Sequence, residues 1–186
     1  MKKASTKKLS QISPILVGLM GSGKSSIGRR LAARLDLPLI DLDDYIVEKI
    51  GRSIPEIFEQ DGEAAFRQME TDALSEVVGK PAVIATGGGA VLSETNRRIL
   101  KEHPPVIWLK ATPEFLATRI DGDSNRPLIA GGDTLSRLRE LAGIRYPLYE
   151  ACADFSLPRC DMKKSEALHE ILRFLKKWRK QQKKRL

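Results

Sequence analysis

The chain has 186 residues, 41% of them hydrophobic, and a formal net charge of +8. This length suits one domain with its own core, and no apolar run is long enough to cross a bilayer. Its two cysteines, Cys152 and Cys160, give neither a disulfide framework nor a metal-binding spacing, and the N-terminus lacks a secretory apolar stretch. We therefore expect a cytoplasmic protein without a membrane partner.

The excess positive charge is expected to lie in two tails. Residues 1–10 hold four lysines and residues 176–186 hold seven lysines and arginines, without an acid in either segment. Residues 11–175 then carry a net charge of −3. Such end blocks are usually solvated, so we expect a disordered basic tail at 1–10, one domain over 11–175 and a basic tail at 176–186. Nucleic-acid binding through the second tail is a minority alternative, which we do not expect.

Hydrophobic periodicity predicts strands that alternate with helices. The expected strands cover residues 15–17, 38–41, 82–86, 105–109 and 154–157. The expected helices cover 26–35, 43–50, a short segment capped by Ser53, 63–78, 93–101, 112–120, 134–149 with breaks at Gly143 and Pro147, and 165–178. This order predicts a parallel sheet covered by helices on both faces.

Residues 18–25, GLMGSGKS, fit the phosphate-binding pattern G-x-x-x-x-G-K-[ST] without a mismatch. An expected strand precedes them and an expected helix follows. This arrangement aims backbone N–H groups and the positive helix end at an anion. We expect Lys24 to reach the β- and γ-phosphates and the Ser25 hydroxyl to bind Mg²⁺. The alternative is a glycine-rich turn that binds no ligand. The strand before it, the helix after it and the Lys24–Ser25 pair argue against this alternative.

Two further groups follow expected strands directly: Asp41 with Asp43, and Gly87–Gly89. Ligands of parallel sheets bind beyond the carboxyl ends of the strands, so we expect both groups to border one crevice with the phosphate loop. Asp41 fits a carboxylate near the metal and Asp43 one at the acceptor hydroxyl. Capping of the next helix competes with this role for Asp43 and is preferred for Asp44. Gly87–Gly89 could form a plain turn, but we favour the interpretation that they let a small ligand approach the backbone closely.

Arginines add candidate anion ligands. Arg67 lies between Glu63 and Glu70 at a spacing that suits surface ion pairs as well as a bidentate carboxylate site. Arg126 stands in a loop flanked by glycines, where closure over a nucleotide would bring its charge to the transferred phosphoryl group. Arg137 and Arg139 are expected to be solvated.

Seven segments in this order resemble shikimate kinases: GLMGSGKS, LIDLDD, GRSIPEIFEQDGEAAFR, METD, TGGGA, NRPLIAG and IRYPLYE. The resemblance implies a three-layer α/β/α P-loop kinase with a five-stranded parallel sheet, a substrate-binding helical segment and a mobile lid at about 121–133. It implies phosphorylation of the 3-hydroxyl of shikimate by ATP, with one Mg²⁺ ion, on the route to chorismate and aromatic amino acids. We expect a monomer.

The resemblance also implies roles for single residues. Those implied to bind ATP are Gly21, Ser22, Gly23, Lys24, Ser25, Ser26, Arg119 along the adenine and Arg126 from the lid. Ser25 would bind the metal directly and Asp41 through water. Those implied to bind shikimate are Asp43, Arg67, Gly87, Gly88, Gly89 and Arg145, with Phe58 and Phe66 lining the pocket. Lys24, Asp43 and Arg126 would be the catalytic residues.

A P-loop kinase for another hydroxy acid, such as gluconate, is the alternative enzyme. Arg67 and Arg145 together indicate a carboxylate acceptor, and the segments LIDLDD and TGGGA favour the cyclic acid. Residues 157–163 do not align with the family, so no adenine contact is predicted there.

Overall fold

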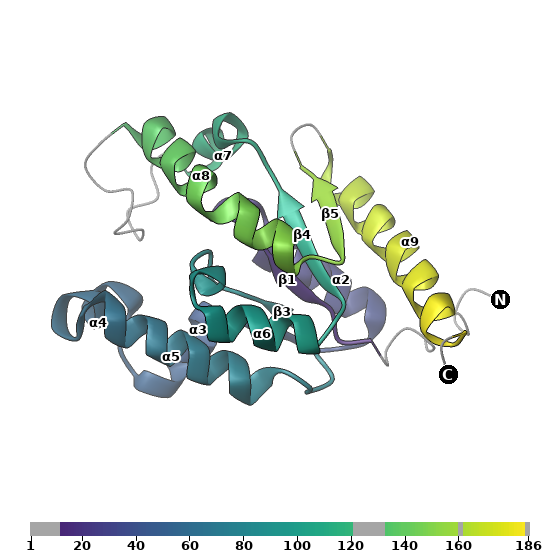
Figure 1. Cartoon of the computed structure of the whole chain (residues 1–186), viewed down its shortest axis with the longest axis horizontal. Helices are drawn as coiled ribbons and strands as arrows, with labels where there is room; N and C mark the ends of the chain where they lie inside the picture. Colours follow the sequence, from purple (N-terminus) through teal and green to yellow (C-terminus); the bar gives the residue numbers. More distant parts are fainter. Residues whose placement is uncertain (1–11, 121–132, 160–161, 185–186) are drawn as a thin grey trace.

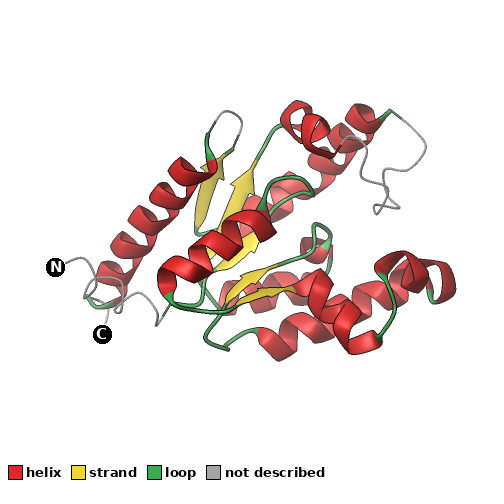
Figure 2. Cartoon of the chain, turned by 180° about the vertical axis from the view of Figure 1, so that it is seen from behind, coloured by secondary structure: helices red, strands yellow, loops and turns green. Residues whose placement is uncertain are grey.

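A five-stranded parallel sheet forms the centre of the computed structural model, which describes residues 12–120, 133–159 and 162–184. Its strands are β1 (Ile15–Val17), β2 (Leu39–Asp41), β3 (Val83–Ala85), β4 (Val106–Lys110) and β5 (Phe155–Pro158), in the order β2-β3-β1-β4-β5. Every pairing is parallel, and helices cover both faces of the sheet (Figure 2). The predicted three-layer class is confirmed.

The helices follow the predicted order. They are α2 (Lys24–Leu35), α3 (Leu42–Ile50), α4 (Ile54–Gln60), α5 (Gly62–Val77), the 3₁₀ helix η1 (Ala90–Leu92), α6 (Glu94–Glu102), α7 (Pro113–Ile120), α8 (Thr134–Cys152) and α9 (Lys164–Gln182). Ser53 caps α4 in a full capping box with Glu56. The expected breaks in α8 are absent, because buried residues on both sides of Gly143 and Pro147 hold the helix against the core.

Successive strand residues fill two separate hydrophobic layers. Ile15 and Val17 pack in the layer with α3, α5 and α8, whereas Leu16 packs in the layer with α2 and α9. Neighbouring side chains of a strand point to opposite faces, so a short apolar run supplies both cores at once. In Figure 1, α6 and α8 lie in front of the sheet and α2 lies behind it.

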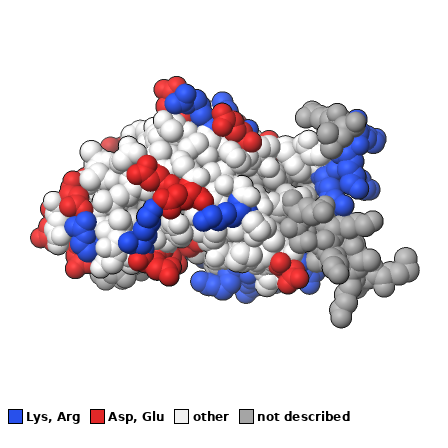
Figure 3. Space-filling view, turned by 90° about the horizontal axis from the view of Figure 1, so that it is seen from below, with Lys and Arg blue, Asp and Glu red and all other residues white. Residues whose placement is uncertain are grey.

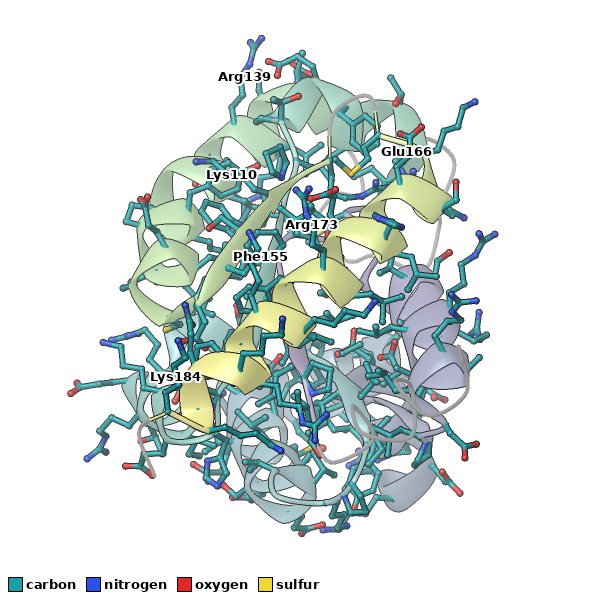
Figure 4. All side chains as sticks on the ribbon, turned by 90° about the vertical axis from the view of Figure 1, so that its right-hand side faces the viewer. Lys110, Arg139, Phe155, Glu166, Arg173 and Lys184 are labelled. Atoms are coloured by element: carbon teal, nitrogen blue, oxygen red, sulfur yellow. The ribbon has the colours of Figure 1, made fainter. Side chains whose placement is uncertain are left out.

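Helix α9 packs along β5 at one edge of the sheet (Figure 4). Phe155 of β5 stacks on Phe174 with ring centroids 4.6 Å apart, and Phe174 contacts Trp178 at 5.8 Å. The helix continues to Gln182, beyond its predicted end at about residue 178, so much of the predicted basic tail at 176–186 is helical. Lys and Arg gather at this end of the molecule (Figure 3). No helix in the described part of the chain is long and apolar enough to cross a membrane.

Candidate active site

A cavity of about 570 Å³ lies beyond the carboxyl ends of β1, β2 and β3. The predicted site residues that line it are Gly21, Gly23, Lys24, Ser25, Ser26, Asp41, Asp43, Arg67, Gly87, Gly88, Gly89, Arg119 and Arg145. Phe58 and Phe66 line it as well, with ring centroids 4.9 Å apart. Its volume is that of a small-molecule pocket.

Two predicted site residues are not in this lining. Ser22 is fully buried, and its amide donates to the Leu19 carbonyl at 3.2 Å. Among the residues that the structure describes, its hydroxyl has no hydrogen-bond partner. It therefore shapes the loop from inside. Arg126 and most of the predicted lid, 121–132, lie outside the described residues.

The loop between β1 and α2 has the geometry of a phosphate site. Gly18 and Gly21 adopt φ of +145° and +77°, and a Cβ at Gly18 would come within 2.8 Å of the Leu109 carbonyl oxygen. No side chain caps α2 and its first turn holds no acid, so its N-terminal amides remain for an anion. Lys24 Nζ donates to the carbonyls of Gly18 at 2.8 Å and Leu19 at 3.1 Å, which keeps the ammonium against the loop.

Asp41 caps α3, because its Oδ1 accepts the amide N–H of Asp43 at 3.2 Å. The interpretation of Asp44 as the cap was wrong: the cap precedes the first helical residue, and Asp44 is the third. Asp44 is exposed, and its pKa is raised by partial burial and by the Asp41 carboxylate. The Asp43 carboxylate lies at the glycine loop, since a Cβ at Gly87 would come within 2.8 Å of its Oδ1.

Arg67 forms the ion pairs that its spacing suits and also faces the cavity. Its Nη2 donates to Glu63 Oε1 and its Nη1 to Glu70 Oε2, each at 3.0 Å, yet the side chain also lines the cavity. A Cβ at Gly89 would overlap its guanidinium. Burial lowers the pKa of Arg67, but the carboxylates of Glu70 and Glu63 raise it by more. The pKa of Arg67 therefore lies above its usual value.

Glu70 is a site residue that sequence reasoning missed. It is 1% exposed, lines the cavity, and has a buried Oε1 without a hydrogen-bond partner among the described residues. Burial raises its pKa to about 7, with Asp43 adding to the rise and Arg67 opposing it. The sequence signal was its position three residues after Arg67 on the same helix face.

The raised pKa of Glu70 predicts a pH-dependent stability. Between its ordinary pKa of 4.5 and about 7, the folded state binds more protons, so the free energy of unfolding falls as pH rises through this window. The loss is on the order of 3 kcal/mol. Urea titrations at several pH values measure the free energy of unfolding, and in Glu70→Gln it should change less between pH 4.5 and about 7. Glu63 is the exposed ion-pair partner of Arg67, so Glu63→Gln should leave this pH dependence unchanged. An unchanged slope in Glu70→Gln would exclude Glu70 as its source.

Arg145 of α8 is 3% exposed and lines the cavity together with Arg67. Its Nη1 donates to the Gly88 carbonyl at 3.1 Å, and its buried Nε has no hydrogen-bond partner in the described part of the chain. Burial lowers its pKa, although Tyr149 opposes the shift. Two guanidinium groups, on α5 and α8, thus contact the glycine loop, an arrangement that suits a bidentate anion.

The oxygen donors of the cavity fit Mg²⁺ that arrives with a nucleotide. Within the described ranges no group of three or more His, Cys, Asp or Glu is arranged to hold a metal. Mg²⁺ commonly takes one or two protein ligands and completes its shell with phosphate oxygens and water. The Ser25 hydroxyl and the Asp41 carboxylate line the phosphate-loop side of the cavity and provide such ligands.

A phosphate loop that shares one cavity with a carboxylate and paired guanidinium groups defines a P-loop phosphotransferase for a small acidic acceptor. A family model described as shikimate kinase matches residues 20–176. The shikimate kinase of Enterococcus faecalis is 44% identical over 87% of this chain and 97% of its own length, and that of Xanthomonas campestris is 42% identical over 89% and 93%.

Solved structures agree with this assignment. A shikimate kinase from Acinetobacter baumannii in complex with shikimate matches with a TM-score of 0.87 and 37% identity, over 91% of this chain and 96% of that one. The Aquifex aeolicus shikimate kinase matches with a TM-score of 0.77 and 31% identity, over 89% and 96%. The chain belongs to the shikimate kinase family and is a kinase, as the resemblance of its motifs implied.

Proposed function

We propose that this protein transfers the γ-phosphoryl group of ATP to the 3-hydroxyl of shikimate, in the route to chorismate and aromatic amino acids. The observation that carries the proposal is the single cavity in which Lys24, Asp43, Arg67 and Arg145 meet. The relative from Acinetobacter baumannii, solved with shikimate, supports this acceptor.

The phosphate-loop side is proposed to bind ATP with one Mg²⁺ ion. The amides of residues 21–26 bind the phosphates, with Ser22 acting through the shape of the loop, and Lys24 neutralises their charge. Ser25 binds the metal and Asp41 reaches it through water. When bound, Mg²⁺ supplies charge compensation on the phosphate oxygens. Arg119 contributes on the adenine side and Arg126 from the lid.

The opposite side is proposed to bind the acceptor. Arg67 and Arg145 hold its carboxylate, and Gly87–Gly89 lie against its ring. Asp43 binds the reacting hydroxyl and takes its proton as the bond to phosphorus forms. These contacts hold the hydroxyl in line with the phosphoryl group, which supplies most of the catalysis in such transfers.

The test is a coupled assay with ATP, Mg²⁺ and a panel of hydroxy acids. We expect turnover with shikimate and none with gluconate. Turnover with gluconate but not with shikimate would show that the proposed acceptor is wrong, while phosphoryl transfer from ATP would still hold. We also propose that the protein is cytoplasmic, where its substrate ATP is found, and that it acts as a monomer.

Neutralising the lysines at the end of α9 should leave shikimate turnover within about twofold of the unmodified protein, because the cavity lies away from this helix. Lys176, Lys177 and Lys180 are exposed, and the triple replacement by Gln keeps helix propensity. Deletion of 176–186 would be a less clean test, since it removes Trp178 from its contact with Phe174. A nucleic-acid binder that depends on this basic segment would instead lose its salt-sensitive affinity for nucleic acid in the triple variant.

A further inference from the structure

The carbonyl oxygen of Gly88 accepts two hydrogen bonds from α8. Tyr149 Oη donates to it at 2.6 Å and Arg145 Nη1 at 3.1 Å. Tyr149 is fully buried, and burial raises the pKa of its phenol well above the usual range. The phenol therefore keeps its proton and stays a hydrogen-bond donor at every pH at which the protein would work.

This carbonyl lies at the junction of the two halves of the cavity. A Cβ at Gly88 would be 3.3 Å from the Met20 amide nitrogen and 3.7 Å from the Gly18 carbonyl oxygen, so Gly88 packs on the phosphate loop. In a trans peptide the C=O and the following N–H point in opposite directions. Holding the Gly88 carbonyl toward α8 therefore turns the Gly89 N–H away from α8 and fixes this peptide plane.

We propose that Tyr149 is a positioning residue for the acceptor, an inference that rests on the proposed function. Arg145 is assigned both to the Gly88 carbonyl and to the carboxylate of the acceptor. When its guanidinium binds the carboxylate, the Tyr149 hydroxyl keeps the Gly88 carbonyl hydrogen-bonded and the glycine loop in place. Without that hydroxyl, Arg145 would leave a half-buried acceptor unpaired each time substrate bound, and substrate binding would weaken.

Tyr146 provides a matched control on the same helix. It belongs to the same aromatic cluster: its ring lies 5.2 Å from Trp108, and the Tyr149 ring lies 5.7 Å from Trp108. The Tyr146 hydroxyl also donates to a backbone carbonyl, but that of Ala111, which follows β4 and does not line the cavity. Tyr146→Phe thus removes an equivalent oxygen without touching the glycine loop.

The experiment compares the steady-state kinetics and thermal unfolding of three proteins. In Tyr149→Phe we expect the shikimate KM to rise about fivefold to thirtyfold, the size of one buried hydrogen bond, with the ATP KM and kcat nearly unchanged. In Tyr146→Phe the shikimate KM should stay within about twofold of the unmodified protein. An unchanged shikimate KM in Tyr149→Phe, or an equal rise of both KM values, would overturn the positioning role. Absence of shikimate turnover in the unmodified protein would instead reject the proposed function.

A second measurement leaves Tyr149 in place. The chain holds three tyrosines, so 3-fluorotyrosine incorporated into the Tyr45→Phe/Tyr146→Phe protein labels Tyr149 alone. We expect shikimate to shift its fluorine NMR signal, because Arg145 changes its contact with the shared carbonyl, and gluconate to leave it unmoved. A signal that does not respond to saturating shikimate contradicts the proposal even if Tyr149→Phe fails to fold.

Discussion

Asp43→Asn should lower shikimate turnover by about 10²- to 10⁴-fold, the usual contribution of a positioned general base. The amide keeps the size of the side chain but has no oxygen basic enough to accept the hydroxyl proton. The variant should still bind ATP, because the phosphate loop and Lys24 are untouched. The measurement is kcat in the coupled assay together with the ATP Kd from calorimetry.

Asp44→Asn is the matched control, since Asp44 is the next residue of α3; it also borders the cavity but is exposed and has no proposed role in the transfer. We expect its kcat to stay within about threefold of that of the unmodified protein. Near-normal kcat in Asp43→Asn would refute the base role. A second readout is available, because the Asp43 carboxylate raises the pKa of Glu70. Removing that charge should lower the pKa of Glu70, so the fall in the free energy of unfolding should end at a lower pH.

The meeting of three strand ends in one cavity could be predicted from the sequence. GLMGSGKS, the Asp41–Asp43 pair and Gly87–Gly89 each follow an apolar strand, and parallel strands end at the same edge of a sheet. The register bears this out, since Ala85 pairs with Leu16 on one side and with Asp41 on the other. The hydrophobic periodicity and the rule that ligands bind beyond the carboxyl ends of parallel strands were sufficient to predict this part of the site.

What the sequence did not show depends on tertiary contacts. Asp41 and Asp44 are both capable caps, and only the point at which β2 turns into α3 selects Asp41. Ser22 belongs to the binding motif, yet the path of the loop buries its side chain. Glu70 appears as an ordinary ion-pair partner until α5 packs against the glycine loop, where a Cβ at Gly87 would overlap its carboxylate. Propensity also failed at Pro147, where packing of α8 prevailed.

Arg67→Ala should raise the shikimate KM by about 10²-fold or more, the effect of losing charged hydrogen bonds in a desolvated pocket. The substitution has a second consequence, because Glu70 is 1% exposed and would lose its cation. Breaking a buried pair on one side costs about 3–5 kcal/mol of stability. A fall in activity could therefore come from partial unfolding and not from a lost substrate contact.

The double variant Arg67→Met/Glu70→Gln separates these two causes, because it removes both charges of the Arg67–Glu70 pair together. We expect near-normal thermal unfolding and an ATP KM close to that of the unmodified protein, with the shikimate KM still raised about 10²-fold. Arg67→Lys should fall between, since lysine keeps the charge and loses the planar fork that matches a carboxylate. If the stable double variant had an unchanged shikimate KM, Arg67 would serve only to neutralise Glu70. The carboxylate would then be held by Arg145 alone.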